Sequence, residues 1–319
     1  MRIYFAPLEG ITDAIFRQCY QACFGGVDKY FMPFVSPSQA LSYTVREEFD
    51  ISPAQNRGLS AVPQILAKNA EYFLGAARGF RDQGYTEVNL NLGCPSGTVT
   101  GKGKGSAMLK DADALQYFLD ALYIAPPLPI SIKTRIGFDD PDEWERLLPI
   151  FARYPIHELI LHPRTRNQQY KGTPYREIFG KTLKRMQCPV IYNGDLFTAS
   201  HCRELMEEYP DTPGIMLGRG LLSNPALLRE LEGGKPLEKE DLFRFHDHLF
   251  RAYLKYWPEG AAVGKMHIFL KYFCHCLHIS NRCLREAMKA NRPQEYQDAA
   301  GELFESAVLK ENPRFSWGE

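Results

Sequence analysis

Short apolar runs recur between residues 3 and 217, separated by a few tens of residues. Several end in Gly, Pro or a polar residue, which is typical of buried parallel strands. The eight runs are Ile3–Ala6, Lys29–Met32, Val62–Leu66, Glu87–Leu92, Ile130–Thr134, Glu158–His162, Val190–Asn193 and Gly214–Leu217. Segments with helical spacing lie between most of them, and the clearest are Ala70–Asp82, Asp113–Leu122, Glu143–Arg153 and Thr198–Glu208.

The alternation of apolar strands with helices predicts an α/β protein built from parallel βα units. Eight units favour a closed (β/α)₈ TIM barrel over an open doubly wound sheet. Catalytic residues of such barrels lie at the carboxyl ends of the strands. These ends carry Pro7, Gln64, Asn91, Cys94, Lys133, Arg135, His162, Asn193 and Gly218. We therefore expect a functional site at this mouth of the barrel.

The pattern changes after Glu230. The segment LEGGKPLEKED (231–241) is polar, contains two adjacent glycines and reads as a linker. From Leu242 to about Leu309 the spacing is helical, with no strand-like alternation. We predict a catalytic barrel over residues 1–235 and a separate α-helical domain over residues 236–319.

Composition restricts the partners and the compartment. Lys plus Arg and Asp plus Glu both number 38 in 319 residues, so a nucleic acid would be bound only through a local basic patch. No run suits a signal peptide or a membrane span of about 20 apolar residues. Eight scattered cysteines favour a reducing, cytoplasmic setting. We expect no metal at CHCLH (274–278) with Cys283, because helical neighbours two apart point in different directions.

The stretch NLNLGCPSGTVTGKGKGSAML (89–109) carries one thiol, Cys94, to the end of a predicted strand. An ordinary thiol has a pKa of about 8.5, so it is mostly protonated near neutral pH and can act as an acid. A buried structural cysteine and a thiolate nucleophile are the alternatives. Gly97–Gly105 is expected to be a flexible lid, and its GKGKG sequence does not fit a P-loop.

Further strand ends suggest a phosphate-bearing cofactor. Gly194 in YNGD and Gly218 in LGRG follow the seventh and eighth strands, where barrels often bind phosphate, and Arg219 adds a guanidinium. Each glycine alone could simply make a tight turn, but the matched pair favours a phosphate site.

Lys133 lies in an apolar strand, where an unpaired charge is costly. Its cation could stabilise negative charge on a reduced isoalloxazine ring. The amides of Gln64 and Asn91 suit the pyrimidine edge of a flavin, and His162 could hydrogen-bond the ring or its phosphate arm. A lone strand-end histidine is more often structural.

The segments APLEGITD (6–13), NLNLGCPS (89–96), KTRIG (133–137), HPRTRNQQYKG (162–172), YNGD and MLGRG occur in this order and spacing. As a set they resemble the tRNA-dihydrouridine synthases over residues 1 to about 230. Many members of that family have HGRT where this chain has HPRT, so Pro163 replaces a glycine. The helical tail matches the family in size and position.

The resemblance implies an FMN-containing barrel followed by a helical tRNA-binding domain. It implies that NADPH reduces FMN, that a hydride then passes to C6 of a uracil, and that Cys94 gives the proton to C5. The flavin-binding residues that it implies are Pro7, Leu8, Gln64, Asn91, Lys133, His162, Asn193, Gly194, Asp195, Gly218 and Arg219.

A uracil within folded tRNA must leave its stack to reach the flavin, and phosphate contacts supply much of the affinity. We expect tRNA to contact Lys102, Lys104, Arg135, Arg164, Arg166, Lys171, Arg282 and Arg285. Residues 244–292 hold nine Lys and Arg against three Asp and Glu, a local net charge of +6, with interleaved tyrosines. No obligate protein partner is evident.

Two other functions fit parts of the pattern. One is a flavin-dependent barrel that reduces a free small molecule, which the basic helical tail disfavours. The other is an RNA-binding protein without catalytic activity, which the presence of Cys94 and Lys133 disfavours.

Overall fold

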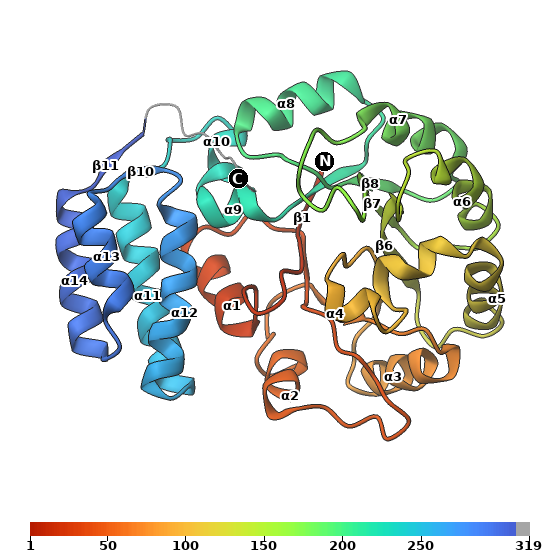
Figure 1. Cartoon of the computed structure of the whole chain (residues 1–319), viewed down its shortest axis with the longest axis horizontal. Helices are drawn as coiled ribbons and strands as arrows, with labels where there is room; N and C mark the ends of the chain where they lie inside the picture. The colour runs from red at the N-terminus through yellow and green to blue at the C-terminus, as the bar shows by residue number, and fades with distance from the viewer. Residues whose placement is uncertain (311–319) are drawn as a thin grey trace.

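A computed structural model describes residues 1–310, and it contains a parallel barrel with a group of helices at one side (Figure 1). The sheet has the order β3-β2-β1-β9-β8-β7-β6-β5-β4. All eight predicted apolar runs contribute strands. They are β1 (Arg2–Phe5), β2 (Lys29–Phe31), β3 (Ala61–Val62), β4 (Gln64–Ile65), β5 (Val88–Leu92), β6 (Ile130–Gly137), β7 (Leu159–Thr165), β8 (Val190–Tyr192) and β9 (Gly214–Leu217).

Pro63 explains why the third run appears as two strands. β3 pairs with β2 and β4 pairs with β5, so the two short strands together occupy one position in the barrel. Pro63 has no N–H to donate to the sheet, but its carbonyl accepts a hydrogen bond from the Asn89 amide at 2.9 Å. The sheet therefore closes around eight positions, which confirms the predicted (β/α)₈ barrel.

Several of the helices that follow the strands begin at side-chain caps. Asn69 accepts a bond from the amide of Tyr72, and Thr198, a predicted N-cap, accepts one from the amide of His201. The predicted helices are present, and the last three differ from the prediction by one or two residues at an end. The helices around the barrel are α1 (Ala14–Cys23), α2 (Val45–Ile51), α3 (Ala70–Asp82), α5 (Ala112–Tyr123), α6 (Glu143–Phe151), α7 (Arg176–Arg185), α8 (Ala199–Glu208), α9 (Arg219–Ser223) and α10 (Leu227–Leu231).

The barrel interior is filled in layers, because side chains two residues apart on a strand point to the same face. The inward-facing side chains form a separate apolar cluster of buried residues, namely Tyr4, Ala6, Phe31, Val62, Ile160, Ile191 and Met216. Continuing the alternation toward the carboxyl ends brings Lys133 of β6 and His162 of β7 to the mouth side of this cluster. The alternation thus places polar side chains at the mouth without disturbing the core.

At the opposite end, the floor of the barrel is a charged network centred on Glu158. Its carboxylate accepts a 2.7 Å hydrogen bond from the Tyr4 hydroxyl and pairs with the guanidinium of Arg2. The Lys29 ammonium lies 2.7 Å from Glu87 and 2.9 Å from Glu158, joining the two carboxylates. Burial and this carboxylate raise the pKa of Tyr4 far above its ordinary value. The network closes the end of the barrel that lies away from the mouth.

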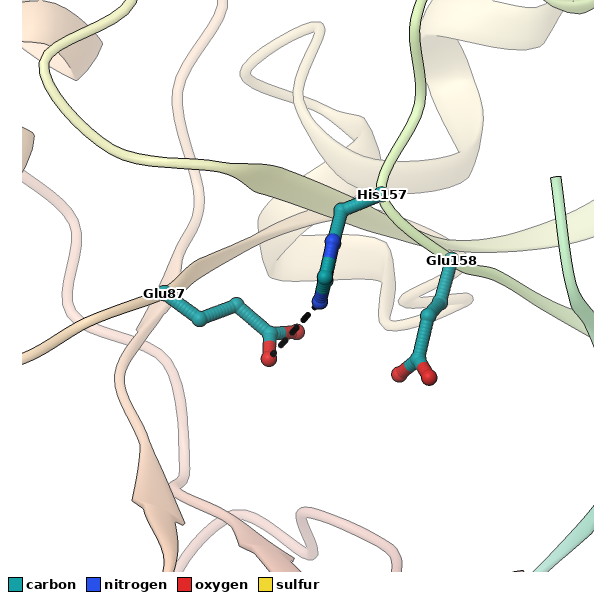
Figure 2. Close-up of side chains that lie close together, drawn as sticks. All are labelled: Glu87, His157 and Glu158. Atoms are coloured by element: carbon teal, nitrogen blue, oxygen red, sulfur yellow. Dashed lines mark ion pairs between the residues drawn. The ribbon is translucent and has the colours of Figure 1, made fainter.

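Glu87, His157 and Glu158 bring ligand-type atoms within 4.8 Å of one another (Figure 2). The His157 ring lies 3.7 Å from Glu87. However, the Lys29 ammonium already bridges both carboxylates, and with Arg2 it balances their two charges. We therefore assign this cluster to the closure of the barrel floor.

The C-terminal helices pack directly on α1. The Phe16 ring stacks on Phe269 with centroids 5.3 Å apart and meets Phe245 edge-on at 5.8 Å. Asp13, the N-cap of α1, accepts a 2.8 Å bond from Tyr253 and pairs with Lys265 at 2.7 Å. The barrel helices and the C-terminal helices therefore share one hydrophobic core, and the boundary at residue 235 stays a prediction. These helices are α11 (Lys239–Tyr256), α12 (Glu259–Phe273), α13 (Asn281–Lys289) and α14 (Pro293–Ser306).

Two details of the C-terminal prediction were wrong. Leu277–His278 (β10) and Val308–Leu309 (β11) form a short antiparallel pair in the region expected to be wholly helical. Two-residue strands are too short to produce an alternating pattern. The predicted linker also ends early, because α11 begins at Lys239 and Asp241 is a buried ion-pair partner of Arg229. The last residues of the predicted helical domain, 311–319, lie outside the described part.

Within residues 1–310, none of the helices has the length and apolar character needed to cross a membrane.

Candidate active site

A cavity of about 540 Å³ opens at the carboxyl ends of the barrel strands. This volume is within the range of small-molecule and cofactor pockets, roughly 300–1,000 Å³. The cavity gathers most of the residues singled out from the sequence. Its lining includes Pro7, Leu8, Gln64, Asn91, Cys94, Lys133, Arg135, His162, Lys171, Asn193, Gly194, Asp195, Gly218 and Arg219.

A chain of amides crosses one wall. Asn91 donates to Gln64 Oε1 at 2.7 Å, and Gln64 in turn donates to Asn89 Oδ1 at 2.8 Å. Asn91 Oδ1 also accepts from the backbone amides of Gly93 and Cys94, at 3.0 and 2.9 Å. Asn91 therefore both lines the cavity and fixes the turn that carries Cys94.

Cys94 is half-buried at the edge of the cavity. Its carbonyl accepts a 2.8 Å bond from the Ser106 hydroxyl, so the backbone at the thiol is held from both sides. Burial raises the pKa of the Cys94 thiol, and the nearby Ser96 amide opposes this only in part. The thiol therefore stays protonated at neutral pH, and no hydrogen bond joins it to a histidine within residues 1–310. This environment suits a proton donor better than a thiolate nucleophile.

The segment after Cys94 contains two short helices, and its expected role as a flexible lid stays a prediction. Gly97–Thr100 forms α4, and Gly105–Lys110 forms the 3₁₀ helix η1. Gly103 and Gly105 adopt φ values of +69° and +61°, which L-residues rarely adopt. The glycines thus permit tight turns that return the chain to Cys94.

One wall of the cavity carries basic side chains. Burial and the neighbouring Arg135 lower the pKa of Lys133 to about 7, and no hydrogen bond or ion pair of its ammonium occurs within residues 1–310. Arg135 is buried and donates to the carbonyls of Gly93, Thr165 and Gln169 at 3.0, 2.8 and 2.8 Å. Lys133 can therefore gain a proton and pair with an anionic ligand, whereas Arg135 holds the surrounding loops through hydrogen bonds.

His162 is neutral in this setting. Burial, followed by the charges of Arg135 and Lys133, lowers its pKa well below the ordinary value. Its Nε2 lies 3.3 Å from Nη1 of Arg164, and a guanidinium can only donate. The Nε2 atom is therefore the acceptor, which leaves the histidine proton on Nδ1.

Asp195 holds the side chains of Arg164 and Arg219 in place beside the cavity. It adopts φ +36°, an uncommon conformation for a residue with a side chain. Its carboxylate accepts from Arg219 at 2.7 Å and from Arg164 Nη1 at 2.9 Å. Arg164 has no exposed surface and also donates to the carbonyls of Lys171 and Gly172. Since a fully buried guanidinium cannot reach an RNA backbone, we do not keep Arg164 as a tRNA contact.

Two glycines shape the wall between β8 and β9. A Cβ on Gly194 would lie 3.1 Å from the Tyr192 hydroxyl, and one on Gly218 would lie 3.2 Å from the Ala6 Cβ. Both contacts are tight, so a side chain at either position would press against a neighbour. Arg219 directly follows Gly218 and also lines the cavity. The cavity lining has four basic residues, Lys133, Arg135, Lys171 and Arg219, against two acidic residues, Glu9 and Asp195, which favours an anionic ligand.

Two tyrosines of the cavity were missed by the sequence reasoning. Tyr170 covers the Arg219 guanidinium at 4.4 Å from its ring centroid and lies within the HPRTRNQQYKG segment, so a signal was present. Tyr272 comes from α12, and no sequence pattern indicated that a C-terminal helix reaches the cavity.

The remaining predicted tRNA contacts lie outside the cavity lining. Lys102 is exposed and Lys104 half-buried on the segment beside Cys94. Arg166 lies over the Phe138 ring at 5.1 Å. Arg282 and Arg285 are exposed on α13, in the group of helices to the left in Figure 1.

Comparisons with known proteins agree with this geometry. A family model described as dihydrouridine synthase (Dus) matches residues 4–310. A probable tRNA-dihydrouridine synthase 2 of Bacillus subtilis (strain 168) is 30% identical over 88% of this chain and 88% of its own. A probable tRNA-dihydrouridine synthase 1 of Synechocystis sp. (strain PCC 6803) is 27% identical over 97% of this chain and 88% of its own.

Solved structures support the fold. Morphinone reductase superposes with a TM-score of 0.52 over 75% of this chain and 87% of its own, at 13% sequence identity. A variant of NCR from Zymomonas mobilis superposes with a TM-score of 0.53 over 75% and 88%, at 14% identity.

Proposed function

The chain belongs to the dihydrouridine synthase family, and we propose that it reduces the C5=C6 bond of uridines in tRNA, the reaction of a tRNA-dihydrouridine synthase. The observation that carries this proposal, beyond the family match, is Cys94. A thiol that burial keeps protonated lies at the rim of a cationic cavity. Such a thiol can supply a proton to a base brought into the cavity.

The cavity fits FMN, which, once reduced by NADPH, supplies the hydride to C6 of the uracil. The volume of about 540 Å³ suits the whole cofactor. The excess of basic side chains and the two glycines that follow β8 and β9 suit its phosphate. In the proposal Gly194, Gly218 and Arg219 hold the phosphate, while Gln64 and Asn91 hydrogen-bond the pyrimidine edge. The other residues that would contact the cofactor are Pro7, Leu8, Lys133, His162, Asn193 and Asp195.

Individual residues of the chain have distinct roles in the proposed reaction. Cys94 gives its Sγ proton to C5 of the uracil, and its thiolate regains a proton from solvent. Asn91 and Ser106 fix the backbone on either side of Cys94, so the thiol needs no reorganisation before transfer. The Lys133 amine has no hydrogen-bond or ion-pair partner in residues 1–310, and it takes up a proton to become an ammonium as negative charge enters the cavity.

Binding of the RNA requires extraction of the uridine from its stack. In the proposal the helical region 236–319 and the rim of the barrel contact the tRNA backbone, and the protein acts in the cytoplasm without a metal ion or an obligate protein partner. The candidate contacts that keep solvent-accessible surface or line the cavity are Lys102, Lys104, Arg135, Arg166, Lys171, Arg282 and Arg285.

The test is product formation. Purified protein with FMN and NADPH is incubated with a tRNA transcript, the RNA is digested, and dihydrouridine is measured by mass spectrometry. We expect dihydrouridine from the transcript and none from free uridine. Reduction of an enone or of free uracil, with the transcript unchanged, would instead indicate a small-molecule reductase.

A further inference from the structure

Three lysines converge beside the cavity from two loops. Lys68 lies in the loop after β4, and Lys102 and Lys104 lie in the turn between α4 and η1. The turn contains Gly103, and a Cβ built on that glycine would lie 3.5 Å from the Lys68 ammonium. The Lys104 ammonium donates a 2.6 Å hydrogen bond to the Ser36 hydroxyl. We call Ser36, Lys68, Lys102 and Lys104 the rim cluster.

The rim cluster is connected directly to the proposed proton donor. Gly105, next to Lys104, is so close to Cys94 that a Cβ on it would lie 3.0 Å from the Cys94 carbonyl oxygen and 3.2 Å from the Cys94 Cβ. Ser106 bonds the same carbonyl. An anion held by the rim cluster would therefore lie next to the thiol rather than at a remote surface.

The charges of the rim cluster are not compensated within the described chain. None of its three ammonium groups takes part in an ion pair with any of residues 1–310. Burial, and then repulsion from Lys102 and Lys68, lower the pKa of Lys104. Ordinary surface lysines spread apart in water or pair with acids. Three that stay together without an acid are stabilised by a bound anion, because each cation then gains an attractive partner.

The position of the rim cluster excludes the flavin phosphate as this anion. The cluster lies at the ends of β4 and β5, whereas Gly194 and Gly218 follow β8 and β9. The strand order places these two pairs at opposite sides of the eight-position barrel. The mouth thus has two cationic regions, one on each side.

We propose that the rim cluster binds one phosphodiester of the RNA substrate, adjacent to the uridine that enters the cavity. This inference rests on the proposed function and adds to it a defined phosphate site. Lysine ammonium groups and a serine hydroxyl are both common phosphate ligands. The contact would hold the backbone beside Cys94 while the base is out of its stack.

The experiment compares the full-length FMN-containing wild-type protein with the Lys102→Gln/Lys104→Gln double variant. A Lys184→Gln variant is the matched control, since Lys184 is an exposed lysine on α7, away from the rim cluster. The dissociation constant for a tRNA transcript is measured over a range of salt concentrations. Flavin content and the rate of flavin reduction by NADPH are measured on the same samples.

We expect the double variant to bind tRNA roughly tenfold more weakly at low salt, with the slope of log K against log salt reduced by about 1. Flavin content and reduction by NADPH should stay at wild-type values, and Lys102→Arg/Lys104→Arg should restore most of the affinity. The Lys184→Gln control should match the wild-type protein.

An unchanged tRNA dissociation constant and salt slope would overturn the inference. A weaker affinity for NADPH would also overturn it, since the site would then belong to the 2′-phosphate of the reductant. If the wild-type protein binds tRNA but forms no dihydrouridine, the proposed reaction fails. The comparison of dissociation constants would still decide whether the rim cluster binds RNA.

Discussion

Replacing Lys133 with Met removes an ionisable group whose charge has no ion-pair partner within residues 1–310. Burial and the neighbouring Arg135 lower the pKa of Lys133 from 10.5 to about 7. An unfolded chain keeps the ordinary pKa, so between about pH 7 and 10 the unfolded state binds more protons at this lysine than the folded state. The contribution of Lys133 to the stability of the flavin-free wild-type protein must therefore become more favourable as the pH rises from about 7 to 10. Met has a similar length and no proton to bind, so Lys133→Met should lack this dependence.

The size of the effect follows from the two pKa values. The difference of 10.5 − 7 = 3.5 corresponds to a penalty of about 5 kcal/mol at pH 7 or below, at 1.36 kcal/mol per pH unit. We take this as a ceiling, because the ammonium contacts the cavity and water there screens it. The flavin-free Lys133→Met variant should thus be more stable than the wild type by a few kcal/mol at pH 7. This advantage should shrink by up to about 1.4 kcal/mol per pH unit as the pH rises toward 10.

Urea unfolding of both flavin-free proteins at pH 7, 8 and 9 measures this difference. With FMN bound, the stability difference between the variant and the wild type should become smaller or change sign, because the wild-type lysine then has a partner. Turnover of the variant should also be slower. A stability difference that does not change with pH would refute the reasoning, since it would mean that Lys133 titrates normally in the folded protein.

Three other substitutions test separate parts of the account. The Cys94→Ala variant should still bind flavin, and NADPH should still reduce that flavin. Reoxidation of the flavin by tRNA should be slower by about 10²- to 10⁴-fold in stopped-flow measurements. Loss of flavin from the variant would instead mean that Cys94 has a structural role. Arg219→Met should raise the dissociation constant for FMN roughly ten- to hundredfold, because a hydrogen bond to a charged phosphate is lost. A fluorescence titration that gives the wild-type dissociation constant would show that Arg219 does not bind FMN. Glu158→Gln should lower the free energy of unfolding by about 1–3 kcal/mol, because Arg2 loses its carboxylate partner and Lys29 keeps only Glu87, while kcat stays unchanged; a urea midpoint equal to that of the wild type would contradict the role given to the barrel floor.

The parts of the fold that follow local patterns were predictable from the sequence. Each barrel strand is an apolar run, and the side chains at its carboxyl end follow the two-residue alternation, so Lys133 and His162 could be placed at one mouth. Pro63 divided the third strand without changing the architecture, because its carbonyl still bonds to Asn89.

Features that depend on packing between distant segments could not be predicted. Asp195 positions Arg219 and Arg164, and nothing in the spacing of these residues indicates that one carboxylate serves both. Tyr272 reaches the cavity only because α11 and α12 pack on α1 through Phe16. The turn at Gly103 and Gly105 has the composition of a flexible loop, which does not indicate the bonds that join it to Cys94.

The most direct test of the central claim is anaerobic. The purified protein is reduced with NADPH, excess NADPH is removed, and tRNA lacking dihydrouridine is added while the visible flavin spectrum is followed. The account predicts that the oxidised flavin bands return with this tRNA and not with free uridine. A flavin that stays reduced in the presence of tRNA would contradict the claim that this cavity transfers hydride to RNA.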